Sequence, residues 1–249
     1  MNKKIIKDFL IITFILQIIF WGGASIICKF TSLTINHILI KVLYYIGLYS
    51  PTIASFISLK RNKAIENILD FIEPIFRFKQ KIKVFIIIIL FLASYFYIGC
   101  MLNTYEKGLP YYSIFLNTLI FFIRGGNEEL GWRMLLQPEL EKKLKFFPAA
   151  IITGIITWLW NTPLFFITGI ETMNYLYFGI TCLMISISTG IIKRNSKGIF
   201  TCMIYHALIL SISTIYVFIS TLLTTTVTLL AFILLSISFL YAFKKEKDS

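Results

Sequence analysis

Acidic and metal-ligating side chains are scarce in this sequence. Its 249 residues include 12 aspartates and glutamates, 2 histidines and 4 cysteines. The cysteines show no CxxC spacing, which argues against a disulfide framework and against a thiolate zinc site. No HExxH segment is present, and a catalytic zinc needs three good protein ligands beside an open position. The sequence therefore leaves the metal and cofactor content unknown and gives zinc little support.

Charge of either sign is too sparse for an ordinary soluble domain. Charged residues make up 14% of the chain, hydrophobic residues make up 57%, and the mean hydropathy is +0.81. A hydrocarbon core needs about 20 apolar residues per helix, and a helix satisfies its own backbone in lipid. We therefore expect an all-α, polytopic membrane helix bundle with about eight transmembrane helices. The expected spans are 8–28, 38–59, 84–102, 113–136, 147–167, 174–192, 199–217 and 221–243.

The basic residues indicate how these helices are oriented. Of the 24 lysines and arginines, 19 fall at the two ends of the chain or in alternate connections. The positive-inside rule then predicts a multi-pass protein of the cell membrane with both termini cytoplasmic. Because the basic residues follow the topology and form no separate domain, we expect membrane lipid as a partner and no nucleic acid.

The connection 60–83 mixes basic residues with isoleucines and phenylalanines at near-helical spacing. This pattern predicts an amphipathic segment that lies on the anionic inner leaflet and is ended or kinked at Pro74. A solvated basic loop is the alternative interpretation.

Four ionisable residues fall inside the expected span 113–136. Arg124 precedes Glu128 by four residues, and Glu129 precedes Arg133 by four, so each glutamate has an arginine one helical turn away. Because a charge at the bilayer centre costs roughly 2.5–3.5 kcal/mol, we expect these side chains to face a water-filled or protein-lined cavity. Intramembrane carboxylates mark functional sites. The structural alternatives are that the four charges form a helix-packing clamp, or that they lie near the cytoplasmic interface.

Residues 127–133, NEELGWR, carry an EExxxR pattern and resemble the CPBP family, the CAAX proteases and bacteriocin-processing enzymes, also called the Abi family. A second family motif, FxxxH, aligns with TWLWN, which ends in Asn161. A third motif, histidine followed four residues later by asparagine or aspartate, aligns with His206 and Leu210. The resemblance covers mainly residues 113–217, which we take as the core.

We place two other regions beside this core. Residues 1–112 hold the N-terminal transmembrane helices with the basic loop 60–83, and residues 218–249 hold a C-terminal transmembrane helix and a basic tail.

The resemblance implies an intramembrane endopeptidase that hydrolyses a CAAX-type peptide bond near the cytoplasmic face, in a peptide or membrane-protein substrate. Glu128 would be the general base that activates water, Glu129 and Arg133 would hold the local charge network, and His206 would donate to the oxyanion. Asn161, which stands where the family has histidine, can orient a water but cannot take its proton.

The departures from the motifs keep other functions open. Leu210 offers no hydrogen bond, and Ser213, on roughly the same helix face as His206, is the candidate to replace that donor. A catalytically impaired family member could act as a bacteriocin immunity or membrane scaffold protein. A small transporter or channel is a further hypothesis, although the chain lacks repeated broken helices.

Overall fold

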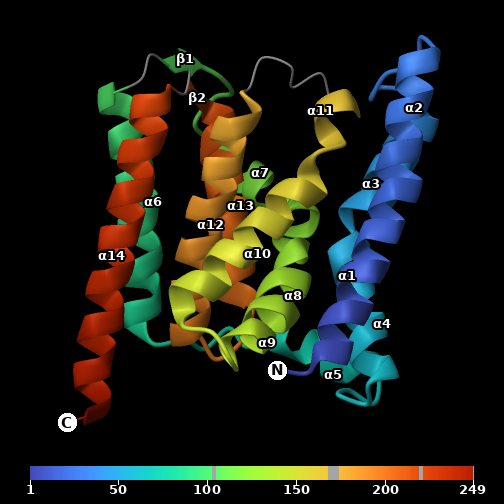
Figure 1. Cartoon of the computed structure of the whole chain (residues 1–249). Helices are drawn as coiled ribbons and strands as arrows, with labels where there is room; N and C mark the ends of the chain where they lie inside the picture. The colour runs from blue at the N-terminus through green and yellow to red at the C-terminus, as the bar shows by residue number, and fades with distance from the viewer. Residues whose placement is uncertain (103–104, 168–173, 219–220, 249) are drawn as a thin grey trace.

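The computed structural model describes residues 1–102, 105–167, 174–218 and 221–248. It confirms the predicted all-α, polytopic helix bundle (Figure 1). One flank consists of α1 (Lys3–Gln17), η1 (Ile18–Gly22), α2 (Gly23–Phe30), α3 (Ile38–Leu48) and α4 (Ser50–Arg61). The other flank consists of α6 (Ile82–Leu102) and α14 (Leu222–Asp248).

The centre of the bundle holds the residues that resemble the protease motifs. The EExxxR segment comprises α7 (Ser113–Arg124), η3 (Gly126–Glu128), α8 (Glu129–Gly131), η4 (Trp132–Leu136) and α9 (Gln137–Glu141). Beside it lie α10 (Phe146–Asn161), α11 (Leu164–Ile167), α12 (Tyr175–Asn195) and α13 (Phe200–Ile215). Helix α10 packs on α12, and α13 packs on α7 (Figure 1).

Three of the eight expected spans are not single long helices. Within the described ranges, five helices are long and apolar enough to cross a membrane, or six if the pair α3 and α4 is one span. This pair bends by 43°, and Pro51, which has no backbone N–H to donate, lies at the start of α4. The expected span 113–136 is broken after Arg124, and 199–217 corresponds to α13, which has 16 residues.

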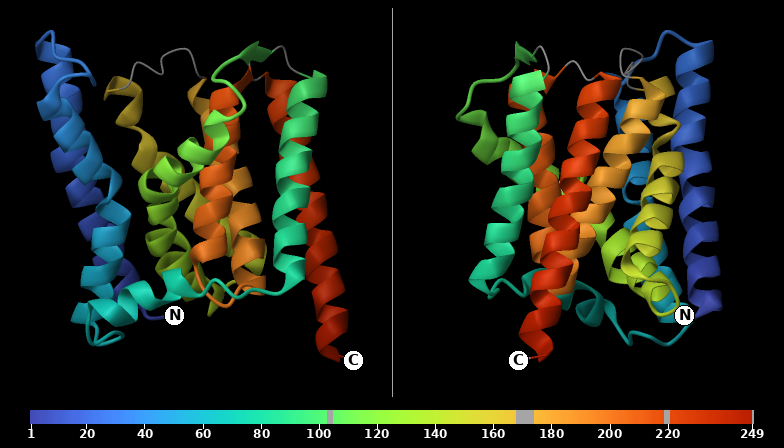
Figure 2. Two further views of the ribbon diagram at one scale, coloured as in Figure 1. Left: turned by 180° about the vertical axis from the view of Figure 1, so that it is seen from behind. Right: turned by 60° about the vertical axis from the view of Figure 1, so that its left-hand side comes forward.

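The start of α1 and the end of α14 lie at the same end of the bundle (Figure 1). The short segments α5 (Ile68–Ile72) and η2 (Glu73–Phe76) run across this end (Figure 2). As the sequence predicts, the helix changes character beside Pro74, because α5 ends one residue before η2 begins at Glu73. Phe71 is buried, whereas Leu69 is exposed, so the segment has an inner and an outer face.

The start of the chain is tied to α9. The backbone N–H of Asn2 donates to Glu139 Oε2 at 2.8 Å. Partial burial raises the pKa of Glu139, but this hydrogen bond and the Lys142 ammonium outweigh it, so the pKa lies below its usual value.

The opposite end of the bundle carries a short antiparallel pair of strands, β1 (Tyr105–Lys107) and β2 (Tyr216–Phe218) (Figure 1).

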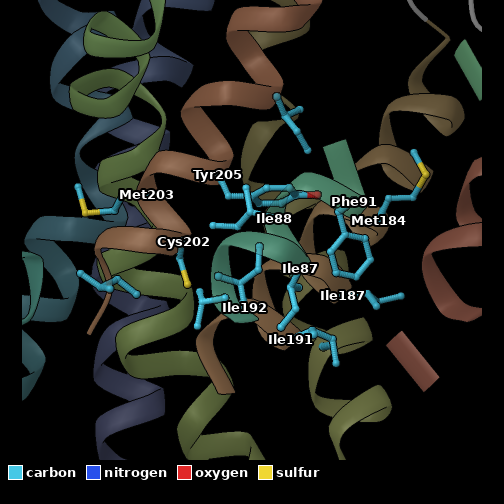
Figure 3. Packing of buried hydrophobic residues seen from close by; sticks show 14 of the residues in the cluster. Ile87, Ile88, Phe91, Met184, Ile187, Ile191, Ile192, Cys202, Met203 and Tyr205 are labelled. Carbon is cyan, nitrogen blue, oxygen red and sulfur yellow. The ribbon is translucent and has the colours of Figure 1, made fainter. Parts of the chain in front are cut away.

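Two buried clusters hold the helices together. Figure 3 shows the first, in which Phe91 of α6, Ile187 of α12 and Tyr205 of α13 pack together. The second joins the N-terminal flank to α10 through Trp21 and Trp160, whose ring centroids lie 4.5 Å apart. The EExxxR segment lies between the clusters, because Leu130 belongs to the first and Trp132 to the second.

Candidate active site

The expected helix 113–136 is interrupted just before the two glutamates. Gly125 and Gly126 disfavour a continuous helix, and Asn127 supplies alternative hydrogen bonds. Its side-chain Nδ2 donates to the carbonyls of Ile123 and Arg124, both at 2.6 Å. These carbonyls stand at the end of α7, so the Asn127 amide takes the place of backbone donors that a continuous helix would supply.

Asn127 also joins this break to the N-terminal flank. The hydroxyl of Thr52, in α4, lies 2.9 Å from Asn127 Oδ1 and 2.8 Å from the Asn127 carbonyl oxygen. The amide of Asn127 is therefore bonded at both ends, and the backbone that leads into Glu128 is fixed from two helices.

Gly126 allows the break to approach α13 closely. A Cβ atom at this position would lie 2.9 Å from the carbonyl oxygen of Met203, which is backbone and cannot swing away. Helix α13 thus lies close to the backbone at this glycine, and this contact brings the glutamates beside the histidine of α13.

The predicted ion pair between Arg124 and Glu128 is wrong. In the described chain no ion pair joins them, because the three residues between them do not form a regular helical turn. The guanidinium of Arg124 instead lies over the rings of Tyr45 and Tyr44, at 5.3 Å and 5.8 Å from their centroids.

The predicted pairing of Glu129 with Arg133 is confirmed. Arg133 Nε lies 3.4 Å from Glu129 Oε2, and the two side chains are 2% and 1% exposed. The same Nε–H donates to the hydroxyl of Thr189 in α12 at 2.6 Å. Glu129 also binds Nδ1 of His206 through its other oxygen, at 2.8 Å. Glu129 therefore links the motif segment to α13, and Arg133 links it to α12.

His206 consequently has one ring nitrogen engaged and one remaining. If Nδ1 carries the proton that binds the Glu129 carboxylate, Nε2 can accept in the neutral ring or donate in the imidazolium. A carboxylate that orients a histidine in this way is also a recurring arrangement in catalytic triads and metal sites.

Glu128 differs from its neighbour in having no basic partner. It is 7% exposed and lines a cavity of about 380 Å³, and no ion pair of the described residues includes it. All five candidate residues line this same cavity: Glu128, Glu129, Arg133, Asn161 and His206. The sequence thus selected side chains that the fold brings together from three separate segments.

One N–H of the Asn161 amide is engaged within α10, which leaves its other N–H and its oxygen for a partner. Its Nδ2 donates to the carbonyl of Thr157 at 2.9 Å, which fixes the orientation of the amide and leaves Oδ1 available. Oδ1 can accept a hydrogen bond from a water molecule, which agrees with the orienting role expected for an asparagine at this position.

The third motif has no donor at Leu210, although hydroxyl groups lie nearby. Leu210 and Ser213 both line the cavity, as does Tyr95 of α6. Ser213 donates to the carbonyl of Ile209 at 2.9 Å and lies 3.4 Å from the Tyr95 hydroxyl. Ser213 therefore faces the site, but its own proton is engaged in the helix.

Ligands for a metal are not gathered here. Among the described residues, no three histidine, cysteine, aspartate or glutamate side chains are placed to hold an ion together. The histidine outside the site, His37, caps α3 by accepting from the N–H of Leu39.

Sequence reasoning missed Thr189, which binds Arg133. Its signal was the run of small polar residues Ser186, Ser188 and Thr189 in an otherwise apolar span, since such residues commonly make contacts between membrane helices. Tyr44 and Tyr45 were also missed, because aromatic residues in a membrane helix give no indication of which cation they meet.

The fold and the cavity define a multi-pass membrane protein with a cluster of ionisable groups inside its helix bundle. The sequence pattern of the family described as type II CAAX prenyl endopeptidase Rce1-like matches residues 79–212. This match covers more than half of the chain, so the chain belongs to the Rce1-like family of CAAX prenyl endopeptidases. The resemblance to CPBP-family proteases is thereby confirmed.

A curated relative agrees with this assignment. The chain is 25% identical over 224 residues to CAAX prenyl protease 2 of Methanococcus maripaludis, and the similarity covers 82% of each protein.

Proposed function

We propose that this protein is a CAAX-type intramembrane endopeptidase that hydrolyses a peptide bond near the cytoplasmic face, with Glu128 as the general base. The observation that carries this proposal is the difference between the two glutamates. Glu129 is bound by His206 and lies beside Arg133, whereas Glu128 lines the cavity with no basic partner among the described residues. A carboxylate free of ion pairs can accept a proton from water.

In the proposed reaction, a water molecule transfers a proton to Glu128 while its oxygen attacks the scissile carbonyl carbon. The carbonyl oxygen becomes an oxyanion, to which His206 donates from Nε2 as an imidazolium balanced by the Glu129 carboxylate. The C–N bond then breaks, and the proton held by Glu128 passes to the leaving amine. Glu128 is regenerated and the water atoms are divided between the two products.

Asn161 and Leu210 limit the rate of this reaction. Asn161 Oδ1 orients the attacking water but leaves Glu128 as the sole proton acceptor of the pair. Leu210 adds no donor at the oxyanion, and the loss of one such donor typically lowers kcat by about 10²–10³-fold. We therefore expect slow turnover.

The orientation in the membrane is part of the proposal. We place both termini in the cytoplasm of a cell-membrane protein, with α5 and η2 on the inner leaflet. Residues 113–217 form the proposed core, and 1–112 supply Tyr44 and Leu48 to the wall of the cavity.

An impaired family member that acts as an immunity or scaffold protein is the second candidate function. It is favoured by the two motif positions occupied by Asn161 and Leu210. In that case the cavity would bind a membrane partner, and the phenotype would survive the change Glu128→Gln.

The decisive experiment measures hydrolysis of a peptide whose prenylated cysteine is followed by three residues. The purified full chain is compared with Glu128→Gln, which keeps the shape of the side chain but removes the base. We expect the rate to fall by about 10²-fold or more. Glu66→Gln makes the same change at an exposed position and should keep the wild-type rate. Equal rates for the wild type and Glu128→Gln would refute the proposed function.

A further inference from the structure

Arg124 is a cation of the cavity that the proposed chemistry does not use. It is the last residue of α7, immediately before the break, and it lines the cavity together with Glu128. At the carboxyl end of a helix an arginine interacts favourably with the helix dipole. That interaction explains a positive charge at this position, but it does not explain why the guanidinium is kept at the cavity wall.

Aromatic rings hold the guanidinium in place. Its central carbon lies 5.3 Å from the ring centroid of Tyr45, 5.8 Å from that of Tyr44 and 5.9 Å from that of Phe121. Rings attract a cation through their faces without neutralising its charge. Some of the N–H groups of the planar guanidinium therefore remain available to an acceptor in the cavity.

The described part of the chain provides no acidic partner for Arg124. Its ion pairs include Arg77 with Glu73, Arg133 with Glu129 and Arg194 with Glu141, whereas no carboxylate lies within 4.0 Å of the Arg124 guanidinium. A partly buried cation beside an apolar wall gains most from an anionic group that can accept two parallel hydrogen bonds. A carboxylate has this geometry.

We propose that Arg124 binds the carboxylate at the C-terminal end of the peptide substrate and so selects substrates that end close to the cleaved bond. This inference rests on the proposed function, because a CAAX segment ends three residues after its cysteine. Arg124 is then a specificity residue, and Glu128, four residues further along the chain, acts on the peptide bond of the same bound segment.

Binding of two peptides tests this assignment separately from catalysis. They share a prenylated cysteine and three following residues, and one ends in a carboxylate whereas the other ends in an amide. The full chain carries Glu128→Gln so that the peptide stays intact during the measurement of Kd. We expect the acid to bind roughly 10- to 100-fold more tightly than the amide, as a charge-assisted pair should.

The preference should disappear when Arg124→Gln is added. The Kd for the acid should rise to that for the amide, while the Kd for the amide stays unchanged, which also shows that the variant is folded. Arg124→Lys keeps the charge but loses the planar fork, so an intermediate preference is expected. Arg194→Gln removes an arginine that lies over Phe146 outside the cavity, and it should leave the preference intact.

Equal affinity for acid and amide, or a preference that survives Arg124→Gln, would overturn the inference. The proposed function fails on a different result. If the wild type hydrolyses neither peptide but the Arg124-dependent preference is present, the binding role stands without the catalytic one. If the wild type hydrolyses both peptides and the Glu128→Gln chain binds both with the same Kd, the catalytic role stands and the role of Arg124 does not.

Discussion

Glu128 and Glu129 are adjacent and chemically identical, yet their carboxylates meet different surroundings. Glu129 is 1% exposed and binds His206, and Arg133 lies on its other side. Removing a carboxylate from such a buried pair leaves the cation uncompensated, which typically costs about 3–5 kcal/mol. Glu128 has no such partner, so its substitution should change chemistry far more than stability.

Restoring the second motif should increase activity. We expect Asn161→His to raise the hydrolysis rate by about 10²-fold, because an imidazole beside Glu128 can share the proton that an amide cannot accept. The measurement is the rate on the prenylated peptide. The double variant Glu128→Gln with Asn161→His should lose the gain, and a rate unchanged by Asn161→His would show that position 161 takes no part in proton transfer.

Single residues also show how far the sequence predicted the site. Spacing predicted the Glu129–Arg133 pair correctly, because helical backbone runs without a break from α8 into η4 between these two residues. The same rule failed for Arg124 and Glu128, because the glycines and Asn127 break the helix between them. The contact of Glu129 with His206 spans 77 positions, so no local spacing could have predicted it.

At the scale of whole elements, the break between α7 and α8 positions the motif. Hydropathy predicted residues 113–136 as one span because it measures composition and does not report where backbone hydrogen bonds are interrupted. The same limitation applied at α3 and α4, which bend by 43° beside Pro51 within one apolar run. Both the break and the bend occur at glycine or proline. These residues within an apolar run indicate an interrupted helix, and the span prediction did not take them into account.

A methyl group at Gly126 should disturb this arrangement. The Cβ of Gly126→Ala would lie 2.9 Å from the Met203 carbonyl oxygen, so η3 must move away from α13. We expect a loss of about 1–3 kcal/mol in stability, as for other overpacked sites, and a lower rate because Glu129 is drawn from His206. A thermal unfolding assay and the peptide assay measure these effects.

Gly23→Ala provides the matched control, because a Cβ there would meet nothing within 4 Å. It should keep the wild-type rate, and its unfolding temperature should equal or exceed that of the wild type, because alanine favours the helix α2 more than glycine does. If Gly126→Ala behaved like this control, the close packing of η3 on α13 would have no part in the site.

At the scale of the whole molecule, the two ends of the chain lie at one end of the bundle (Figure 1). This arrangement agrees with an even number of crossings, although helices of uneven length and form replace the eight regular spans expected from hydropathy. The pattern of basic residues predicted that both ends of the chain lie on the same side, since this pattern depends on the order of the connections and not on the shape of each helix.

Cysteine labelling of intact cells tests the predicted orientation. Single cysteines are introduced by Lys63→Cys and Tyr112→Cys, both at exposed positions, after the four native cysteines are replaced. An impermeant reagent should label Tyr112→Cys in intact cells and should reach Lys63→Cys once the cells are broken. Labelling of Lys63→Cys in intact cells would reverse the proposed topology.

The hydrogen bonds of Asn127 make the N-terminal flank part of the geometry of the proposed site. Thr52 of α4 holds the residue that directly precedes Glu128, although α4 carries none of the three motifs. A tilt of α4 would shift the backbone at Asn127 and, one residue later, the proposed base. Variation at Thr52 can therefore retune the active site of a relative in which every motif residue is unchanged, and a search by motif alone would not detect it.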